Sequence, residues 1–411
     1  MADTNLFTGS AGVLFFPRGL VWRSATVGYL FYAAGTTVVY RKTSDGGETW
    51  GAEVAVITFG NAFYAADIWF DRWTPGDTGT VIHVGADGHD PSGGQVKVYY
   101  RNLDTSTDTL SAQVTVFSGA GGGLTSVFGI TKARGGNLYL GPDTSFFKSV
   151  DGGANWTSQA NPFANASDWG LLMPGAEVDT NDIWIMLWKL GGNIVFKVYD
   201  QSANSWSADE TILTPTGAGV LANAAQMSAA QRHSDNHVFL VVYPAGINLT
   251  AANLRVFDIA GSGQIYEGAI LKDSAGPGVR HLSLTIDQAE DAIYAAWQGD
   301  DGTNGYVDYA MSKQSARYWR RRTAFTQETR GYIRLSADMS IRNGDAGRLF
   351  FAVLSVSPTN TVWTNLGNSF DLPSPIEVGA PIKTEARAIA PVRSDAPLAT
   401  RTPTRTAPAD P

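Results

Sequence analysis

The stretch KTSDGGETW, residues 42–50, decides the fold, because it returns as KSVDGGANW at residues 148–156. Both copies read (Ser/Thr)-x-Asp-x-Gly-x-x-Trp, and each follows an apolar run of strand length. An Asp side chain can accept hydrogen bonds from nearby backbone N–H groups, and glycine supplies the positive φ angles of a tight turn. The pattern therefore predicts two β-hairpins whose turns satisfy their own polar groups.

Eight residues define the repeated turn. Each copy contains a hydroxyl residue, the Asp, a Gly and a Trp that can be buried as an anchor. We expect both Asp side chains to accept backbone hydrogen bonds within their own turns, and both Trp side chains to be largely buried. We therefore interpret the turn as a structural element. The predicted structural residues are Thr43, Asp45, Gly47, Trp50, Ser149, Asp151, Gly153 and Trp156.

The two copies resemble the Asp-box of the sialidase/BNR-repeat families. In those families the box joins the third and fourth strands of a β-propeller blade, so the resemblance implies a propeller. Repeated apolar runs of strand length, most of them preceded by turn residues, favour the same architecture. The runs cover residues 27–35, 80–87, 137–142, 182–188, 237–243, 292–297 and 348–356. We predict one seven-bladed antiparallel β-propeller over residues 12–373, nearly free of helix, with six blades as the alternative.

The composition narrows the classes of function. The 411 residues include 45 Gly and 12 Trp but no Cys, which favours β structure and excludes disulfides and thiolate chemistry. A net charge of −8 argues against a broad nucleic-acid interface. The apolar runs are too short to predict membrane insertion, and the first residues do not resemble a secretion signal.

No cofactor and no metal site are expected. His233 and His237 have the spacing of ligands on a helix, but they flank a turn signal inside a β-rich region. The Gly-rich stretch GADGHDPSGG, residues 85–94, contains two Asp residues but lacks the alternating oxygen ligands of a calcium loop.

Both ends of the chain differ from the predicted propeller. Residues 1–11 precede the predicted propeller as a short N-terminal segment. Residues 374–411 contain seven of the 18 prolines and no aromatic residue, so they predict an extended arm that cannot form a core alone. We expect this arm to make assembly contacts through its apolar side chains, which are Ile376, Val378, Ile382, Ile389, Val392 and Leu398.

Catalytic residues are hard to place. The resemblance implies three arginines that grip a carboxylate, a Tyr–Glu nucleophile and an Asp acid. Arg18 matches the first arginine, but the Ile-Pro that should follow is missing, and the loop AAGTT has no carboxylate to act as the acid. Arg280 and Arg334 hold comparable positions, so the three arginines could converge to bind an anionic ligand, or could form salt bridges between blades. Nothing singles out a Tyr–Glu pair, although Tyr306, Tyr309 and Glu328 are available.

These observations favour a non-catalytic propeller that serves as a structural or binding component of a larger assembly. A bacteriophage virion protein fits best, because it would be made in the host cytoplasm without a signal and used outside the cell. Its expected partners are other virion proteins or copies of itself, bound through the arm, and a host glycan. The alternatives are a sialidase-like glycoside hydrolase or glycan-binding protein, and a cytoplasmic scaffold for protein interactions.

Overall fold

A computed structural model gives the fold of the chain. Contacts within the chain divide it into two compact units, Met1–Asp371 and Leu372–Pro411. The predicted arm, residues 374–411, and its six apolar positions lie outside the residues that the structure describes. The described residues are 4–8, 13–89, 95–120, 129–141, 145–164, 168–178, 180–189, 192–215, 227–243, 254–272, 280–300, 305–313, 320–326, 333–341, 351–355 and 361–364.

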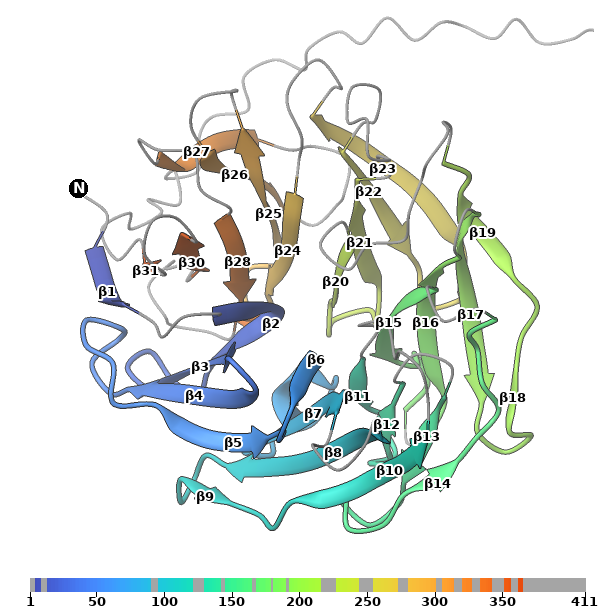
Figure 1. Cartoon of the computed structure of the whole chain (residues 1–411). Coiled ribbons are helices and arrows are strands. Elements are labelled where there is room, and N and C mark those ends of the chain that lie inside the picture. Colours follow the sequence, from blue (N-terminus) through green and yellow to red (C-terminus); the bar gives the residue numbers. More distant parts are fainter. Residues whose placement is uncertain are drawn as a thin grey trace, which may run out of the picture. The chain divides into compact units, whose positions relative to one another are not determined.

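The described chain is all-β (Figure 1). Its single helical element in these ranges is the short 3-10 turn η1 (Asp71–Trp73), which follows an inner strand. Within the same ranges no helix is long and apolar enough to cross a membrane.

Six sheets are formed by strands that are consecutive in the chain, apart from one added strand in sheet 6. Sheet 1 contains β2 (Val13–Trp22), β3 (Gly28–Ala34), β4 (Thr37–Thr43) and β5 (Val54–Thr58). Sheet 2 contains β6 (Ala62–Phe70), β7 (Val81–His89), β8 (Gln95–Asp104), β9 (Thr109–Leu110) and β10 (Val114–Ala120). Sheet 3 contains β11 (Ile130–Lys132), β12 (Leu138–Leu140), β13 (Phe147–Ser149) and β14 (Thr157–Ser158).

The next three sheets follow the same plan. Sheet 4 contains β15 (Trp169–Pro174), β16 (Ile183–Trp188), β17 (Ile194–Asp200), β18 (Ser205–Trp206) and β19 (Glu210–Leu213). Sheet 5 contains β20 (Met227–Gln231), β21 (Val238–Val242), β22 (Leu254–Ile259) and β23 (Ile265–Lys272). Sheet 6 contains β24 (Arg280–Asp287), β25 (Ala292–Asp300), β26 (Gly305–Lys313) and β27 (Arg320–Thr326), and β29 (Ser340–Ile341) pairs with β24 in parallel.

A seventh sheet brings together strands from both ends of the sequence. It contains β28 (Ile333–Ala337), β30 (Phe351–Ser355), β31 (Thr361–Thr364) and β1 (Thr4–Thr8), in that order. β1 pairs antiparallel with β31, so the fourth strand of this sheet comes from the N-terminal segment. The predicted N-terminal segment therefore belongs to the fold.

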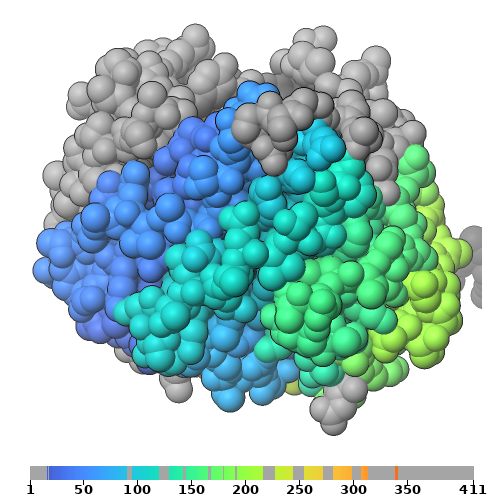
Figure 2. All heavy atoms as spheres, turned by 60° about the horizontal axis from the view of Figure 1, so that its bottom comes forward, coloured from blue at the N-terminus to red at the C-terminus, as the bar shows by residue number. Residues whose placement is uncertain are grey.

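The first strands of the sheets contact one another in a ring. β2 contacts β6, and contacts continue through β11, β15, β20, β24 and β28 back to β2. The remaining strands of each sheet extend outward from this ring (Figure 1). Figure 2 shows the first sheets side by side in chain order, from blue to green. Radial sheets around a common axis define a β-propeller, so the predicted propeller with almost no helix is confirmed.

Burial follows the position of a strand within its sheet. β15 and β16 are buried along their whole length. The outer strand β5 is largely exposed, and β14 is exposed at both residues. Because a neighbouring sheet covers each face of a sheet, inner strands need continuous apolar runs instead of alternation. This packing explains why the sequence shows such runs so clearly.

Candidate functional site

The first repeated turn joins β4 to β5, the third and fourth strands of sheet 1. Thr43 Oγ1 accepts a hydrogen bond from the N–H of Gly47 at 2.9 Å, and Asp45 Oδ1 accepts one from the N–H of Thr49 at 3.0 Å. The Thr43 hydroxyl also donates to Asp45 Oδ1 at 2.7 Å. The turn therefore satisfies its own donors, as expected from its residues.

The second repeated turn joins β13 to β14 and repeats the same bonds. Ser149 Oγ accepts from the N–H of Gly153 at 2.8 Å, and Asp151 Oδ1 accepts from the N–H of Asn155 at 2.9 Å. Hydrogen bonds from the Asn155 side chain and backbone lower the pKa of Asp151 to about 2. Both Asp side chains are exposed, as are Thr49 and Asn155, whose N–H groups bond to them, so the two carboxylates stabilise their turns at the surface.

The two tryptophans of the repeated turns are partly buried. Trp50 and Trp156 both have intermediate exposure, so neither lies free in solvent and neither is fully enclosed, and the expected burial is found in part. The Trp50 ring meets the Trp22 ring edge to face, with the centroids 6.4 Å apart. Trp156 packs against the core, and its Nε1 donates to the carbonyl of Gly153 at 3.0 Å.

The second turn is fastened to the neighbouring sheet through Tyr100 of β8. The Tyr100 hydroxyl donates to the carbonyl of Gly152 at 3.1 Å, and its ring lies 5.1 Å from the Trp156 ring. A Cβ atom on Gly153 would lie 2.0 Å from Tyr100 Cε1, so this position has room for glycine alone. The turn thus connects sheet 3 to sheet 2.

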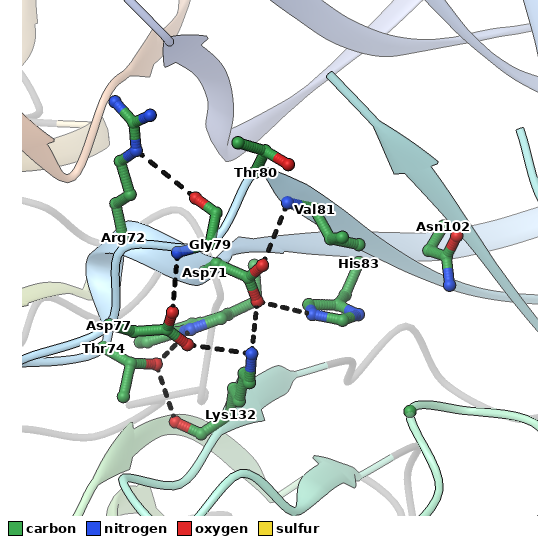
Figure 3. Close-up of polar contacts among 12 residues, drawn as sticks. Asp71, Arg72, Thr74, Asp77, Gly79, Thr80, Val81, His83, Asn102 and Lys132 are labelled. Carbon is green, nitrogen blue, oxygen red and sulfur yellow. Dashed lines mark hydrogen bonds and ion pairs between the residues drawn. The ribbon is translucent and has the colours of Figure 1, made fainter. Parts of the chain in front are cut away.

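Tyr100 belongs to a buried polar network around Asp71 of η1. His83 Nδ1 lies 2.7 Å from the Tyr100 hydroxyl, and its Nε2 lies 3.0 Å from Asp71 Oδ1. Lys132 at the end of β11 places its Nζ 2.6 Å from Asp71 Oδ1 and 2.8 Å from Asp77 Oδ2 (Figure 3). The N–H of Val81 donates to Asp71 Oδ2 at 2.9 Å.

The network is electrostatically satisfied. Burial alone would raise the pKa of Asp71, but hydrogen bonds and charge from His83 and Lys132 outweigh it and lower that pKa. Burial lowers the pKa of Lys132, while Asp71 and Asp77 raise it by more. Burial also raises the pKa of Tyr100. Because Asp71, His83 and Tyr100 are all buried, this network acts as a structural link between sheets 2 and 3.

Residues at the ends of the inner strands are joined by further hydrogen bonds. Trp73 is the last residue of η1, and its Nε1 donates at 2.7 Å to Oδ1 of Asp338, which lies just after β28. Asp338 Oδ2 also accepts the N–H of Trp22, at the end of β2, at 2.6 Å. His233 Nε2 lies 3.2 Å from the carbonyl of Trp73, and the Thr74 hydroxyl donates to the carbonyl of Lys132 at 2.9 Å. These bonds around the buried Trp73 therefore link sheets 1, 2, 3, 5 and 7 at the ends of their inner strands, an arrangement that we call the Trp73 collar.

Arg18 lies inside the ring of inner strands, in an irregular stretch of β2. Its Nε donates to Asp67 Oδ1 of β6 at 3.2 Å, Nη2 pairs with Asp67 Oδ2, and Nη1 lies 3.5 Å from the carbonyl of Leu172 in β15. The N–H of Ile130 in β11 also donates to Asp67, at 3.1 Å. Burial raises the pKa of the Asp67 carboxyl, and Arg18 opposes that shift. Arg18 thus forms the salt bridge between sheets that was one of its two expected roles.

For the other two arginines, Arg280 and Arg334, the structure describes the backbone alone. Arg280 begins β24, and Arg334 is the second residue of β28, so both lie on inner strands as Arg18 does. Their side chains lie outside the described part of the structure. The meeting of the three arginines at an anion site therefore stays a prediction.

The catalytic residues implied by the resemblance do not assemble in the described ranges. Gly35 and Thr36 alone join β3 to β4, and Gly35 has a φ of 63°, so this hairpin has no room for an acid-bearing loop. Tyr309 is buried. The side chain of Tyr306 and the whole of Glu328 lie outside the described residues.

The two histidines with ligand-like spacing have separate partners. The N–H of His233 donates to Gln288 Oε1 at 2.8 Å, and His237 Nδ1 lies 2.7 Å from Asp258 Oδ1. Among the described residues, no three His, Cys, Asp or Glu side chains are grouped so that they could hold a metal ion.

One pair of chemically active side chains was missed by the sequence analysis. Tyr64 of β6 and His89 of β7 meet at the end of sheet 2 where β6 begins, and both are partly exposed. The Tyr64 hydroxyl lies 3.1 Å from His89 Nδ1 and 3.3 Å from Nε2. The stretch GADGHD, residues 85–90, contains His89, but its local pattern gives no sign that His89 meets Tyr64 of the neighbouring strand.

Comparisons with known proteins identify the class of fold. No protein-family model matches the chain, and neither does any curated protein. An ulvan lyase of polysaccharide lyase family PL25 is similar in structure, with a TM-score of 0.60 at 10% identity, over 88% of this chain and 95% of that chain. YCF48 from Cyanidioschyzon merolae gives a TM-score of 0.47 at 12% identity, over 88% and 97%.

A third similar structure is the SapL1 lectin in complex with α-methyl fucoside, with a TM-score of 0.44 at 16% identity, over 75% of this chain and 96% of that chain. At such low identities a structural likeness establishes the fold alone. The chain is therefore a β-propeller protein, and its function has to be argued from its own residues.

Proposed function

We propose that this chain is a non-catalytic β-propeller that serves as a structural and binding component of a larger assembly. The observation that carries the proposal is the use of charged groups in the interior. Arg18 pairs with Asp67 and Lys132 pairs with Asp71 as links between sheets, and Asp71 also pairs with His83 within sheet 2. A catalytic site needs acids and bases that can reach a substrate. The charged side chains of these two clusters are instead bonded to one another.

We also infer that each of the seven sheets is one blade. The ring of first strands supports this count, because sheet 7 contributes β28 to the ring between β24 and β2. The seventh blade would then be completed by β1. An experimental density map that shows six radial sheets would contradict the inference.

We propose a virion as the assembly. The lack of cysteine and the Pro-rich residues 374–411 support a particle component with an arm. Ordering such an arm costs on the order of 1 kcal/mol per residue in backbone entropy. A partner surface, on another virion protein or on a second copy, would have to offset that cost.

Deleting residues 374–411 tests this role. The truncated chain should stay folded and soluble, as measured by circular dichroism and gel filtration, but should no longer be incorporated into the assembly. A second variant changes Ile382 and Ile389 to Ser and keeps the length of the arm. It should show the same loss of incorporation, because it removes two of the expected apolar contacts. Normal incorporation of the truncated chain would contradict the proposal.

The second candidate is a glycoside hydrolase of the sialidase type. The two-residue hairpin between β3 and β4 argues against it, because the acid that would protonate the leaving group has no place there. The purified protein should release no fluorophore from a fluorogenic sialoside. Turnover that disappears in the Arg18→Ala variant would overturn the proposed non-catalytic role.

A further inference from the structure

We propose that Tyr64 and His89 form a carbohydrate-binding site at the end of sheet 2 where β6 begins. This proposal rests on the binding role proposed above and gives that role a location and a class of ligand. The two residues do not belong to the repeated turns, to the Asp71 network or to the Arg18–Asp67 pair.

The backbone around Tyr64 is irregular. The pairing of β6 with β7 shifts between Phe63 and Ala65, so Tyr64 is the extra residue of a β-bulge. The N–H of Ala65 donates to Asp87 Oδ1 at 2.8 Å, and Asp87 is completely buried. A buried carboxylate thus holds the bulge in place. Bulges often redirect a side chain next to a functional site, and this one directs Tyr64 towards His89.

The position of His89 is also fixed by its neighbours. Gly88 has no room for a side chain, because a Cβ atom there would lie 2.3 Å from the carbonyl oxygen of Ala62 and 2.6 Å from Phe59 Cδ1. The N–H of Asn61 donates to the carbonyl of His89 at 3.2 Å. In these three consecutive residues, Asp87 holds the bulge, Gly88 allows the close approach of its neighbours, and His89 provides the functional side chain.

The two side chains suit a sugar. The Tyr64 and His89 rings are almost perpendicular at 88°, with centroids 4.9 Å apart, and both are partly exposed. A tyrosine presents an apolar ring together with a polar tip, and a neutral imidazole offers one donor and one acceptor. Sugars combine apolar C–H faces with clustered hydroxyl groups, so this pair can recognise both features at once.

The comparison with the other His–Tyr pair supports the assignment. His83 and Tyr100 are buried and bonded to Asp71 and to a backbone carbonyl, so a ligand cannot reach them. The Trp73 collar lies at the opposite end of β6 from Tyr64. The Tyr64–His89 pair therefore differs from the His83–Tyr100 pair in being partly exposed, and it lies away from the Trp73 collar.

Binding to an array of neutral and acidic oligosaccharides tests the site. We expect the wild-type chain to bind at least one class, and Tyr64→Phe and His89→Gln each to weaken that binding about tenfold, as measured by titration calorimetry. Tyr266→Phe is the matched control, because Tyr266 is an exposed tyrosine on β23 whose hydroxyl donates to Gln264 Oε1 at 2.6 Å. His237→Gln is the control for the histidine. Both controls should bind as the wild type does.

The outcomes separate this inference from the assembly role. The proposed site is contradicted if no oligosaccharide binds. It is also contradicted if the two site variants bind as tightly as the wild type and have unchanged melting temperatures. Chemical-shift changes confined to sheet 2 on adding the oligosaccharide would support the location even if one variant folds poorly, and changes confined to other sheets would contradict it. None of these results depends on residues 374–411, so a failed assembly test and a failed binding test can be told apart.

Discussion

At the scale of single residues, Gly152 and Gly153 provide a matched comparison within one turn. Both have positive φ angles, 71° and 97°, but a Cβ atom would meet empty space at Gly152 and the Tyr100 ring at Gly153. We expect Gly152→Ala to cost about 1 kcal/mol from backbone strain alone. Gly153→Ala should cost clearly more, because Tyr100 would also have to move. Urea unfolding of both variants measures the difference, and equal losses would show that the turn is not packed on sheet 2.

The carboxylate of Asp151 predicts a dependence on pH. Its pKa falls from 3.8 to about 2 in the folded state, so the ionised form is the one that the fold stabilises. Its contribution is therefore complete above about pH 4 and is lost as the pH falls through the range towards pH 2. Asp151→Ala should lower the unfolding free energy at pH 7, and the difference from the wild type should shrink between pH 4 and pH 2. If the difference in unfolding free energy stays constant over this range, the ionised carboxylate of Asp151 is not what stabilises the turn.

At the scale of elements, the buried Asp71 network should matter more than an exposed ion pair. Asp71→Asn removes the charge that His83 and Lys132 share, and loss of one partner in a buried pair typically costs about 3–5 kcal/mol. Asp209→Asn is the control, because Asp209 pairs with Lys189 at the surface, where about 0–1 kcal/mol is usual. Chemical unfolding at pH 7 compares the two variants. Similar losses would contradict the assignment of the network as a link between sheets.

The apolar runs in the sequence predicted one class of strand very well. Each run overlaps the second strand of one sheet, from β3 in sheet 1 to β30 in sheet 7. From β3 to β25, the second strands are buried along most of their length, so consecutive residues are apolar; the side chains of β30 lie outside the described part of the structure. The pairing of β1 with β31 could not be predicted in this way, because backbone pairing between distant segments leaves no local pattern.

The candidate site was predictable only in part, for a similar reason. The bonds of Asp45 and Asp151 are local, so the residues within each turn were enough to predict them. The salt bridge of Arg18 was one of two expected roles, but its partner Asp67 lies in the next sheet and was not identified. Tyr64 was not predicted, because it meets His89 through a bulge that only the pairing of β6 with β7 reveals.

At the scale of the whole molecule, the N-terminal strand should contribute to stability far from its place in the sequence. Deleting residues 1–8 removes β1 and leaves the outer edge of β31 unpaired. A few backbone hydrogen bonds at about 1 kcal/mol each should then be lost, which corresponds in a chain of this size to a melting temperature roughly 4–5 °C lower. Calorimetry measures the shift, with a deletion of residues 1–3 as the control that keeps β1. An unchanged melting temperature would show that β1 does not help to stabilise sheet 7.

The same pairing has a consequence for synthesis on the ribosome. Sheets 1 to 5 can each form as soon as their own consecutive strands emerge, but β1 must wait for β31. Some 350 residues separate the two strands, so at about 5–20 residues per second the wait is roughly 20–70 s. During translation the first strand of the chain is therefore the last to be paired, and neighbouring nascent chains on the same messenger RNA can compete for its free edge.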